Sequence, residues 1–224
     1  LDLGIKPEVY DSMVQNRFEL ARAARPRLFE EILRLLRGGA AARSMWLLWE
    51  IGALAVLLPE LSAFLDDEEA TDGGAARFWK TLRALDAHTR AHGPLGDIQL
   101  SALLFQEALD EAMAGTRDAS GAALDFLEPI VERVAMPRRI ADGVRRIAMM
   151  VPKLLQGRSA RLARTELFDA ALDVAEVSLH ARGASTAMID TIRREHPPHT
   201  RPAPVRVPGG GGGARRSPRV RRIP

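Results

Sequence analysis

The chain has 224 residues and no cysteine, which excludes disulfides, thiolate metal sites and cysteine nucleophiles. Hydrophobic residues make up 46% of the sequence and aromatic residues 5%, which is typical of a helical protein with a core of ordinary size. The sequence has no run of 18 apolar residues and no basic-then-apolar N-terminal segment, so we expect a soluble, cytoplasmic protein without membrane contact.

The charge is unevenly distributed along the chain. The net charge is +3, but residues 196–224 hold seven arginines and no acid, so residues 1–195 carry −4. Prolines, five consecutive glycines and arginines fill this C-terminal part, a composition that predicts a disordered tail. A mildly acidic folded part with a strongly basic tail indicates an arm that binds a polyanion.

Apolar residues at helical spacing predict three helices before an exposed acidic loop at residues 66–74. These helices are expected over residues 8–23, 26–37 and 40–51. Pro26 is tolerated in a first helical turn, and the Gly38-Gly39 pair provides the stop for the second helix. The third helix ends at Gly52, and residues 53–58 are expected to form a brief apolar turn.

Six further helices are predicted after the acidic loop. They are expected over residues 75–92, 98–114, 122–135, 137–157, 165–183 and 185–195. Asp97 and Thr165 are the expected N-caps, whereas Pro129 should kink its helix or open a new first turn. No strand pattern occurs, so the predicted fold is all-α, an irregular bundle or array of about eight or nine helices.

Two groups of residues resemble metal ligands by type. Residues 66–72 contain five acids, but they lack the alternate ligand order, central glycine and closing glutamate of a calcium loop. His88 and His92 are four residues apart, as in zinc-binding helices, but Thr89 replaces the catalytic glutamate and no third ligand is evident. We therefore expect no metal site in the chain.

Basic side chains recur on the helix predicted for residues 137–157 and directly after it. Arg138 and Arg145, like Arg139 and Arg146, are seven residues apart and therefore share one helical face. With the junction that follows and the tail, they form a candidate track for phosphates. The candidate residues are Arg138, Arg139, Arg145, Arg146, Lys153, Arg158, Arg161, Arg164, Arg215, Arg216, Arg219, Arg221 and Arg222. The alternative is a solvated face in an arginine-rich protein.

Residues 26–61 carry an ordered series of motifs. It runs from a proline through R-L-F-E-E, a glycine pair and W-E-I-G to L-L-P-E-L, and L-G-I-K-P-E at residues 3–8 precedes it. The series resembles the segment that follows the catalytic head in bacterial poly(A) polymerases and CCA-adding tRNA nucleotidyltransferases. Looser similarities follow at residues 103–105 (L-L-F), 136–139 (M-P-R-R) and 168–171 (F-D-A-A). The last of these resembles a helix of the poly(A) polymerase branch.

The resemblance implies a function in RNA processing and polyadenylation. In that family a two-metal head transfers AMP from ATP to an RNA 3′-hydroxyl, while the neck and body hold the RNA. ATP and Mg²⁺ are therefore expected for the parent enzyme and no cofactor for this chain. The head's G-S or G-G turn followed by a D-x-D pair of metal-binding carboxylates, and its R-R-D-F strip, do not occur in this sequence, so we expect the chain alone to be inactive and the head domain to be its partner.

The same resemblance implies a division of the chain into three parts. Residues 1–65 correspond to a neck-like region, residues 75–195 to an RNA-binding body and residues 196–224 to the disordered tail. Four residues match the neck helix, where their implied role is to brace the head. They are Arg27, Glu30, Glu31 and Arg34. Arg27 with Glu31, and Glu30 with Arg34, also have the spacing of plain surface ion pairs.

Two other functions are compatible with the sequence. The CCA-adding branch shares the neck region, although the F-D-A-A helix and the long basic tail favour poly(A) addition. A helical protein-interaction module with no RNA role is the second alternative. Binding of single-stranded RNA 3′ ends should weaken steeply with salt, whereas helix-in-groove protein binding should depend on salt only weakly.

Overall fold

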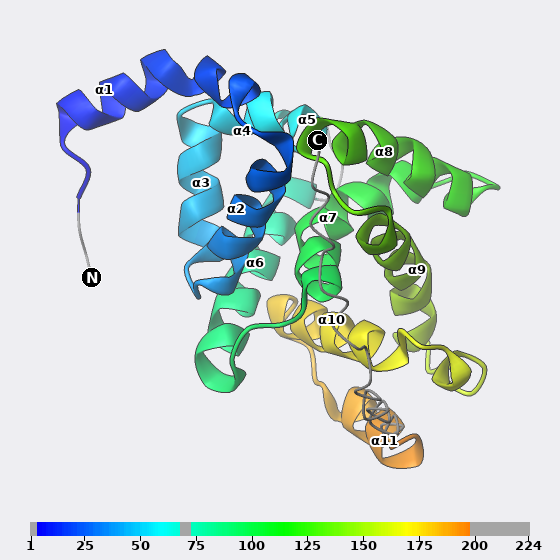
Figure 1. Ribbon diagram of the computed structural model, residues 1–224. Coiled ribbons are helices and arrows are strands. Elements are labelled where there is room, and N and C mark those ends of the chain that lie inside the picture. The colour runs from blue at the N-terminus through cyan, green and yellow to red at the C-terminus, as the bar shows by residue number, and fades with distance from the viewer. Residues whose placement is uncertain (1–3, 68–72, 198–224) are drawn as a thin grey trace, which may run out of the picture.

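The structure is a computed structural model that describes residues 4–67 and 73–197. Within these residues the chain forms eleven α-helices and two 3₁₀ helices, and no strand (Figure 1). The elements are α1 (Pro7–Asn16), η1 (Arg17–Arg22), α2 (Arg25–Arg37), α3 (Ala41–Glu50), α4 (Ala53–Leu57), α5 (Pro59–Asp66), α6 (Gly74–His92), α7 (Asp97–Met113), α8 (Ala119–Val134), α9 (Arg138–Leu154), η2 (Leu162–Arg164), α10 (Phe168–Ala181) and α11 (Ala187–Glu195). The predicted all-α class is confirmed.

The expected count of eight or nine helices was too low. Residues 53–58, predicted as a turn, contain the short helix α4, and Pro59 begins α5 instead of closing the segment. Gly52 adopts φ 72°, a left-handed conformation that lets the chain turn sharply between α3 and α4. Proline suits the first position of α5 because that amide has no helical acceptor.

Helix α7 lies at the centre of the molecule (Figure 1). Its side chains from Leu100 to Leu109 are all buried, because α6, α8, α9 and α10 contact it on different sides. A helix that is apolar on most sides has to lie inside a bundle in this way. The approach of α9 is close, since a Cβ added at Gly143 would lie 2.8 Å from Cγ2 of Ile98.

The first predicted helix is wrong in its length. Residues 8–23 were expected to form one amphipathic helix, but α1 ends at Asn16 and the 3₁₀ helix η1 follows. At this point side chains compete for backbone carbonyls, since Asn16 Nδ2 donates to the oxygen of Ser12 (2.8 Å) and Arg17 donates to that of Val14. Neither α1 nor η1 contains a buried residue, and α1 extends away from the bundle in Figure 1.

Both predicted N-caps are wrong, because the two side chains have other partners. Asp97 is the first residue of α7 and forms an ion pair with Arg37 of α2. Thr165 donates to the carbonyl of Leu162 (2.7 Å), and α10 begins three residues later. The side-chain cap in this half of the chain is Asp118, which accepts from the amide of Gly121 (2.8 Å) at the start of α8.

Prolines lie inside two helices without ending them. Helix α8 continues through Pro129, so a new first turn does not open there. Helix α9 likewise continues through Pro152 and ends two residues later, while Pro137 directly precedes its first residue.

One cluster of buried side chains extends from Phe29 of α2 to Ile192 of α11. The division into a neck-like region and a body at residues 65–75 stays a prediction. Residues 68–72 of the acidic loop and the tail from residue 198 lie outside the described residues. None of the described helices is both long and apolar enough to cross a membrane.

Candidate nucleic-acid interface

The basic face predicted on α9 lies against α8. Arg145 is half-buried, donates to the hydroxyl of Ser120 (Nη1–Oγ 2.6 Å) and pairs with Asp142 (Nη2–Oδ1 2.6 Å). Arg146 lies 3.9 Å from the same carboxylate. The charge of Asp142 therefore offsets part of the charge of both arginines, and Arg145 is held by the protein itself.

The first turn of α9 is more open. Arg138 pairs with Glu128 of α8 at 3.2 Å, with 78% of its side chain exposed. Arg139 is also exposed, and within the described part of the chain it has no hydrogen-bond or ionic partner. Of the four arginines on α9, Arg139 is thus the one whose full charge faces solvent.

The last turn of α9 and the junction after it hold four more of the predicted residues. They are Lys153, Arg158, Arg161 and Arg164. All four are exposed, and none has an ionic partner among residues 4–67 and 73–197. Because no carboxylate competes for these cations, the junction has the charge and exposure that phosphate binding requires. The tail residues Arg215, Arg216, Arg219, Arg221 and Arg222 lie outside the described residues.

The four residues matched to the neck helix lie on the exposed face of α2. Arg34 pairs with Glu31 at 3.6 Å, whereas the expected partner at i,i+4 was Glu30. Arg27 is exposed on the same face. An exposed pair of this kind contributes little to stability, about 0–1 kcal/mol. The four side chains are exposed, and their role in bracing a head domain stays a prediction.

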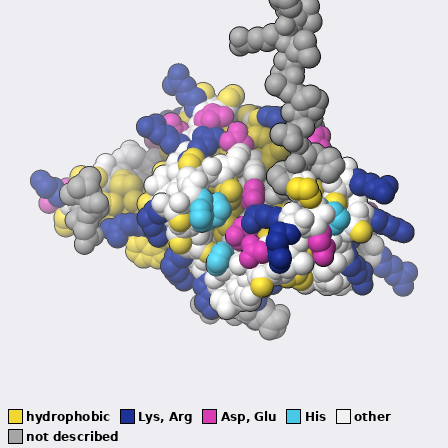
Figure 2. Space-filling view, turned by 90° about the horizontal axis from the view of Figure 1, so that it is seen from below, with side chains coloured by type: hydrophobic (Ala, Val, Ile, Leu, Met, Phe, Trp, Pro, Cys, Tyr) yellow, Lys and Arg dark blue, Asp and Glu magenta, His cyan; other side chains and the backbone are white. Residues whose placement is uncertain are grey.

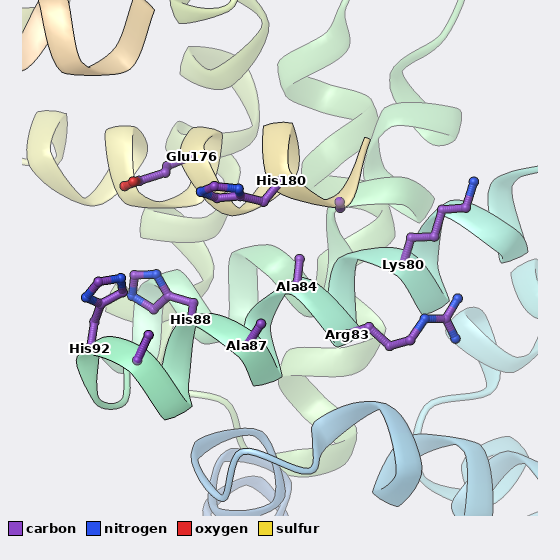
Figure 3. Close-up of a pocket in the computed structure, with 10 residues that line it drawn as sticks. Lys80, Arg83, Ala84, Ala87, His88, His92, Glu176 and His180 are labelled. Carbon is purple, nitrogen blue, oxygen red and sulfur yellow. The ribbon is translucent and has the colours of Figure 1, made fainter. Parts of the chain in front are cut away.

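A groove of about 550 Å³ lies between α6 and α10. Figure 3 shows Lys80 and Arg83 at one end of it, and His88 and His92 at the other end across from His180. The rings of His88 and His92 are 5.0 Å apart. We name this feature the α6–α10 groove.

The histidines of the α6–α10 groove are the metal-ligand candidates noted in the sequence, His88 and His92, together with His180. Across the described residues there is no group of three or more His, Cys, Asp or Glu side chains placed to hold a metal ion. Burial lowers the pKa of His88, and the nearby charge of His92 lowers it further, so the neutral ring is favoured at pH 7.

An ion-pair network borders the same groove. Arg193 of α11 donates to Asp173 (2.9 Å) and lies 2.7 Å from Glu176, and Gln99 of α7 donates to Asp173 (3.3 Å). Burial raises the pKa of Asp173, an effect that the hydrogen bonds from Gln99 and Arg193 oppose. Figure 2 shows this face, with histidines beside a group of acidic and basic side chains and further basic side chains projecting at the edge.

A second groove of about 550 Å³ lies between α3 and α6. Its lining residues are Ala42, Arg43, Trp46, Ala76, Trp79, Lys80 and Arg83. Lys80 and Arg83 also line the α6–α10 groove, so the two grooves meet on α6. We name this feature the α3–α6 groove. It combines two indole rings with three cationic side chains.

The α3–α6 groove was not predicted from the sequence. The available signal was a tryptophan three or four positions from an arginine in each helix, Arg43 with Trp46 in α3 and Trp79 with Arg83 in α6. Only the packing of α3 on α6 brings the two patterns to one site.

The comparisons with known proteins concern the first third of the chain. Residues 2–65 match a family model described as the probable RNA- and SrmB-binding site of polymerase A. No curated protein matches the chain. The matched span includes α2 with its exposed charges and the α3 side of the α3–α6 groove, whereas α6, α9 and the similarities noted at residues 103–105, 136–139 and 168–171 follow it. Residues 2–65 are therefore similar to the RNA-binding region of the poly(A) polymerase family.

Proposed function

We propose that this chain holds the single-stranded 3′ end of an RNA for a polynucleotide adenylyltransferase, the enzyme class that transfers AMP from ATP to the RNA 3′-hydroxyl. The observation that carries the proposal is the match of residues 2–65 to the RNA-binding region. Unpaired cations at the junction after α9 and in the α3–α6 groove support it, because phosphates are bound mainly by charge.

The AMP-transfer step is assigned to a separate catalytic head domain. The described residues do not fit a magnesium site, since they contain no group of carboxylates and histidines placed to hold an ion. We therefore attribute no step of AMP transfer to them. The chain's own contribution is to bind and position the RNA, and the head that it serves is its proposed protein partner.

The test is the affinity of the full chain for a fluorescein-labelled 12-nucleotide single-stranded RNA, measured by anisotropy between 50 and 200 mM NaCl. Neutralising about six phosphates gives a slope of about −4 in log affinity against log salt, so affinity should fall about 250-fold over this range. No binding, or binding that is insensitive to salt, would reject the proposal.

A variant of the full chain distinguishes RNA binding by the tail from RNA binding by the rest of the surface. It replaces with glutamine the residues Arg215, Arg216, Arg219, Arg221 and Arg222. We expect this variant to bind more weakly but to keep a steep salt slope. Complete loss of binding would mean that the tail alone contacts RNA.

The CCA-adding alternative is distinguished by its substrate. A tRNA transcript without its 3′-terminal CCA should compete no better than unstructured RNA if the chain serves poly(A) addition. Competition that is tenfold stronger for the tRNA would favour the CCA-adding branch.

Protein binding is a second candidate function, favoured by the exposed apolar side chains at the start of the chain. Ile5, Val9 and Phe18 expose 43%, 51% and 62% of their surface, and the description of the matched region names SrmB beside RNA. Purified SrmB should then co-elute with the chain in size-exclusion chromatography and separate from a Val9→Asp, Phe18→Asp variant. Co-elution that the variant does not change would exclude this surface.

A further inference from the structure

The α3–α6 groove holds its two tryptophans in different ways. Trp79 is half-buried, in edge contact with Phe78 (ring centroids 4.8 Å apart) and tilted against Trp49 at 6.1 Å. The indole of Trp49 in turn donates to Asp66 (2.8 Å). Trp46 has none of these restraints: 47% of it is exposed, and no other described ring contacts it. The groove thus has one fixed indole wall and one that is open to a ligand.

The cations of the groove are not balanced by acids. Arg43, Lys80 and Arg83 are exposed and have no ionic partner in the described part of the chain. Arg43 also lies in the first turn of α3, where the helix dipole disfavours a positive charge. Arg43 has no acid beside it in its own helix turn, so its exposed charge is available to a ligand that carries negative charge.

Two alanines, Ala42 and Ala76, also line the groove. Ala42 precedes Trp46 by one helical turn on α3, and Ala76 precedes Trp79 and Lys80 by one turn on α6. Their methyl groups leave the space of about 550 Å³ between the two helices, enough for a flat ring beside an indole.

We infer that the α3–α6 groove binds unpaired nucleotides of RNA, with a base stacked on Trp46 and its flanking phosphates on Arg43, Lys80 and Arg83. An exposed aromatic face with cations at its edge is the arrangement by which proteins bind single strands. Duplex nucleic acid does not fit this arrangement, because its bases already stack on one another. An acidic peptide would use the cations but leaves the open indole without a flat partner.

The two grooves together offer a continuous path for the RNA strand along α6. Lys80 and Arg83 belong to both grooves, so a strand that leaves Trp46 along α6 enters the α6–α10 groove at these two residues and runs toward His88 and His92 at its other end. From residue 76 to residue 92 the axis of α6 spans about 24 Å. The inference rests on the proposed RNA-holding function and names the surface that performs it.

The test compares variants of the full chain in RNA binding by anisotropy, each checked for folding by circular dichroism. Trp46→Ala removes the stacking surface, Trp46→Phe retains a smaller one, and a triple variant changes Arg43, Lys80 and Arg83 to Gln. Matched controls are Leu124→Ala, an equally exposed apolar residue on α8, and Arg117→Gln, an exposed cation outside both grooves.

Trp46→Ala should weaken binding about 5- to 140-fold without changing the salt slope, because only stacking is lost. Trp46→Phe should fall between this variant and the parent chain. The triple variant should reduce the salt slope by about 2, which corresponds to three phosphate contacts on a single strand. On an RNA with abasic positions, Trp46→Ala and the parent chain should bind alike.

The inference is wrong if Trp46→Ala binds within twofold of the parent chain, or if it loses the same factor on the abasic RNA. In that case the parent chain still binds RNA and the proposed function stands. If the parent chain itself does not bind RNA, the proposed function fails together with the inference. A change of oligomeric state in Trp46→Ala would show that the indole covers a second copy of the chain, and would equally overturn the inference.

Discussion

The carboxylate of Asp86 caps a helix that lies 45 residues before it in the chain. Its oxygens accept from the amides of Ala41 (2.6 Å) and Ala42 (3.1 Å), the first two residues of α3, and Asp86 itself is 6% exposed. Two amide groups that lack helical acceptors are satisfied in this way, and a negative charge meets the positive end of the helix dipole. This contact fixes the start of α3, and with it Arg43 and Trp46, onto α6.

Replacing Asp86 with alanine should therefore affect both stability and RNA binding. Loss of a helix cap costs about 0.5–2 kcal/mol, and two buried amides left without acceptors make the upper end the expected result. Urea unfolding measures this cost. RNA affinity at 100 mM salt, under conditions where the variant is folded, should fall because α3 loses its position beside α6.

Asp86→Asn is the matched control, since its side chain keeps one acceptor oxygen. It should lie between the parent chain and Asp86→Ala in both measurements. If Asp86→Ala unfolds at the same urea concentration as the parent chain, the cap does not stabilise α3.

A second prediction concerns the ion pair between α5 and α8. Arg133 donates from both terminal nitrogens to Glu60, each at 2.7 Å, and the side chains are only 31% and 19% exposed. A paired, partly buried charge of this geometry contributes about 1.5–3 kcal/mol, so Glu60→Ala should lower the free energy of unfolding by that amount.

The control pair for Glu60 is Glu19 with Arg22, which has a similar distance of 2.7 Å but exposures of 59% and 79%. Glu19→Ala should change the free energy of unfolding by less than about 0.5 kcal/mol. Equal effects of the two substitutions in urea unfolding would show that burial does not govern these pairs.

A third prediction concerns pH. Burial raises the pKa of Asp110 to about 6 from 3.8, and the neighbouring charge of Glu107 adds to the effect, while Arg182 and Arg77 oppose it. The folded state therefore binds this proton more tightly than the unfolded state, so its contribution to stability decreases as pH rises from 3.8 to about 6. Above about pH 6 the Asp110 carboxylate is ionised in the folded state, and the full free-energy cost of burying its charge is present.

Asp110→Asn should accordingly stabilise the protein by about 1–3 kcal/mol at pH 7.5 and by much less near pH 4, because asparagine is neutral throughout. Urea unfolding of both proteins at the two pH values measures the difference. Glu111→Gln, an exposed neighbour on α7, is the control. A gain for Asp110→Asn that is the same at both pH values would contradict the assignment.

A fourth prediction separates the junction after α9 from α9 itself. Glutamine at Arg158, Arg161 and Arg164 should reduce the salt slope of RNA binding by about 2, since these exposed cations have no competing carboxylate. Glutamine at Arg138 and Arg145 should reduce it less, because both guanidinium groups already pair with acids.

Anisotropy titrations of the junction variant and the α9 variant over a range of salt concentrations measure the two salt slopes. A larger reduction for the α9 variant would mean that RNA displaces Glu128 and Asp142 from their arginines, and that α9 is the principal track.

Helices whose ends are marked by a proline or a glycine pair in the sequence could be predicted. Helix α2 starts one residue before Pro26, ends before the Gly38-Gly39 pair as expected, and Gly39 adopts φ 69°. Contacts between distant residues could not be predicted in this way. Asp97 was expected to cap its own helix, yet Arg37 binds it from 60 positions away. The end of α1 likewise depends on side chains that compete for local carbonyls.

The candidate interface shows the same division between local and distant information. The basic residues around α9 could be named from the sequence, and Asp142 lies on the same helix as its arginines, but the pairing of Arg138 with Glu128 could not be assigned in advance because Glu128 comes from another helix. The α3–α6 groove could not be predicted at all, because Trp46 and Lys80 belong to separate helices that meet only in the fold. The positions of charged residues can be read from the sequence, whereas ion pairs between different helices depend on how those helices pack.

The most direct test of the account is photo-crosslinking of a 4-thiouridine-labelled single-stranded RNA to the full chain, with the attached peptides mapped by mass spectrometry. We predict crosslinks on the α3 peptide that contains Trp46 and on residues 76–83 of α6, and their reduction in Trp46→Ala. Crosslinks confined to residues 198–224, or to surfaces outside the two grooves and the α9 junction, would contradict it.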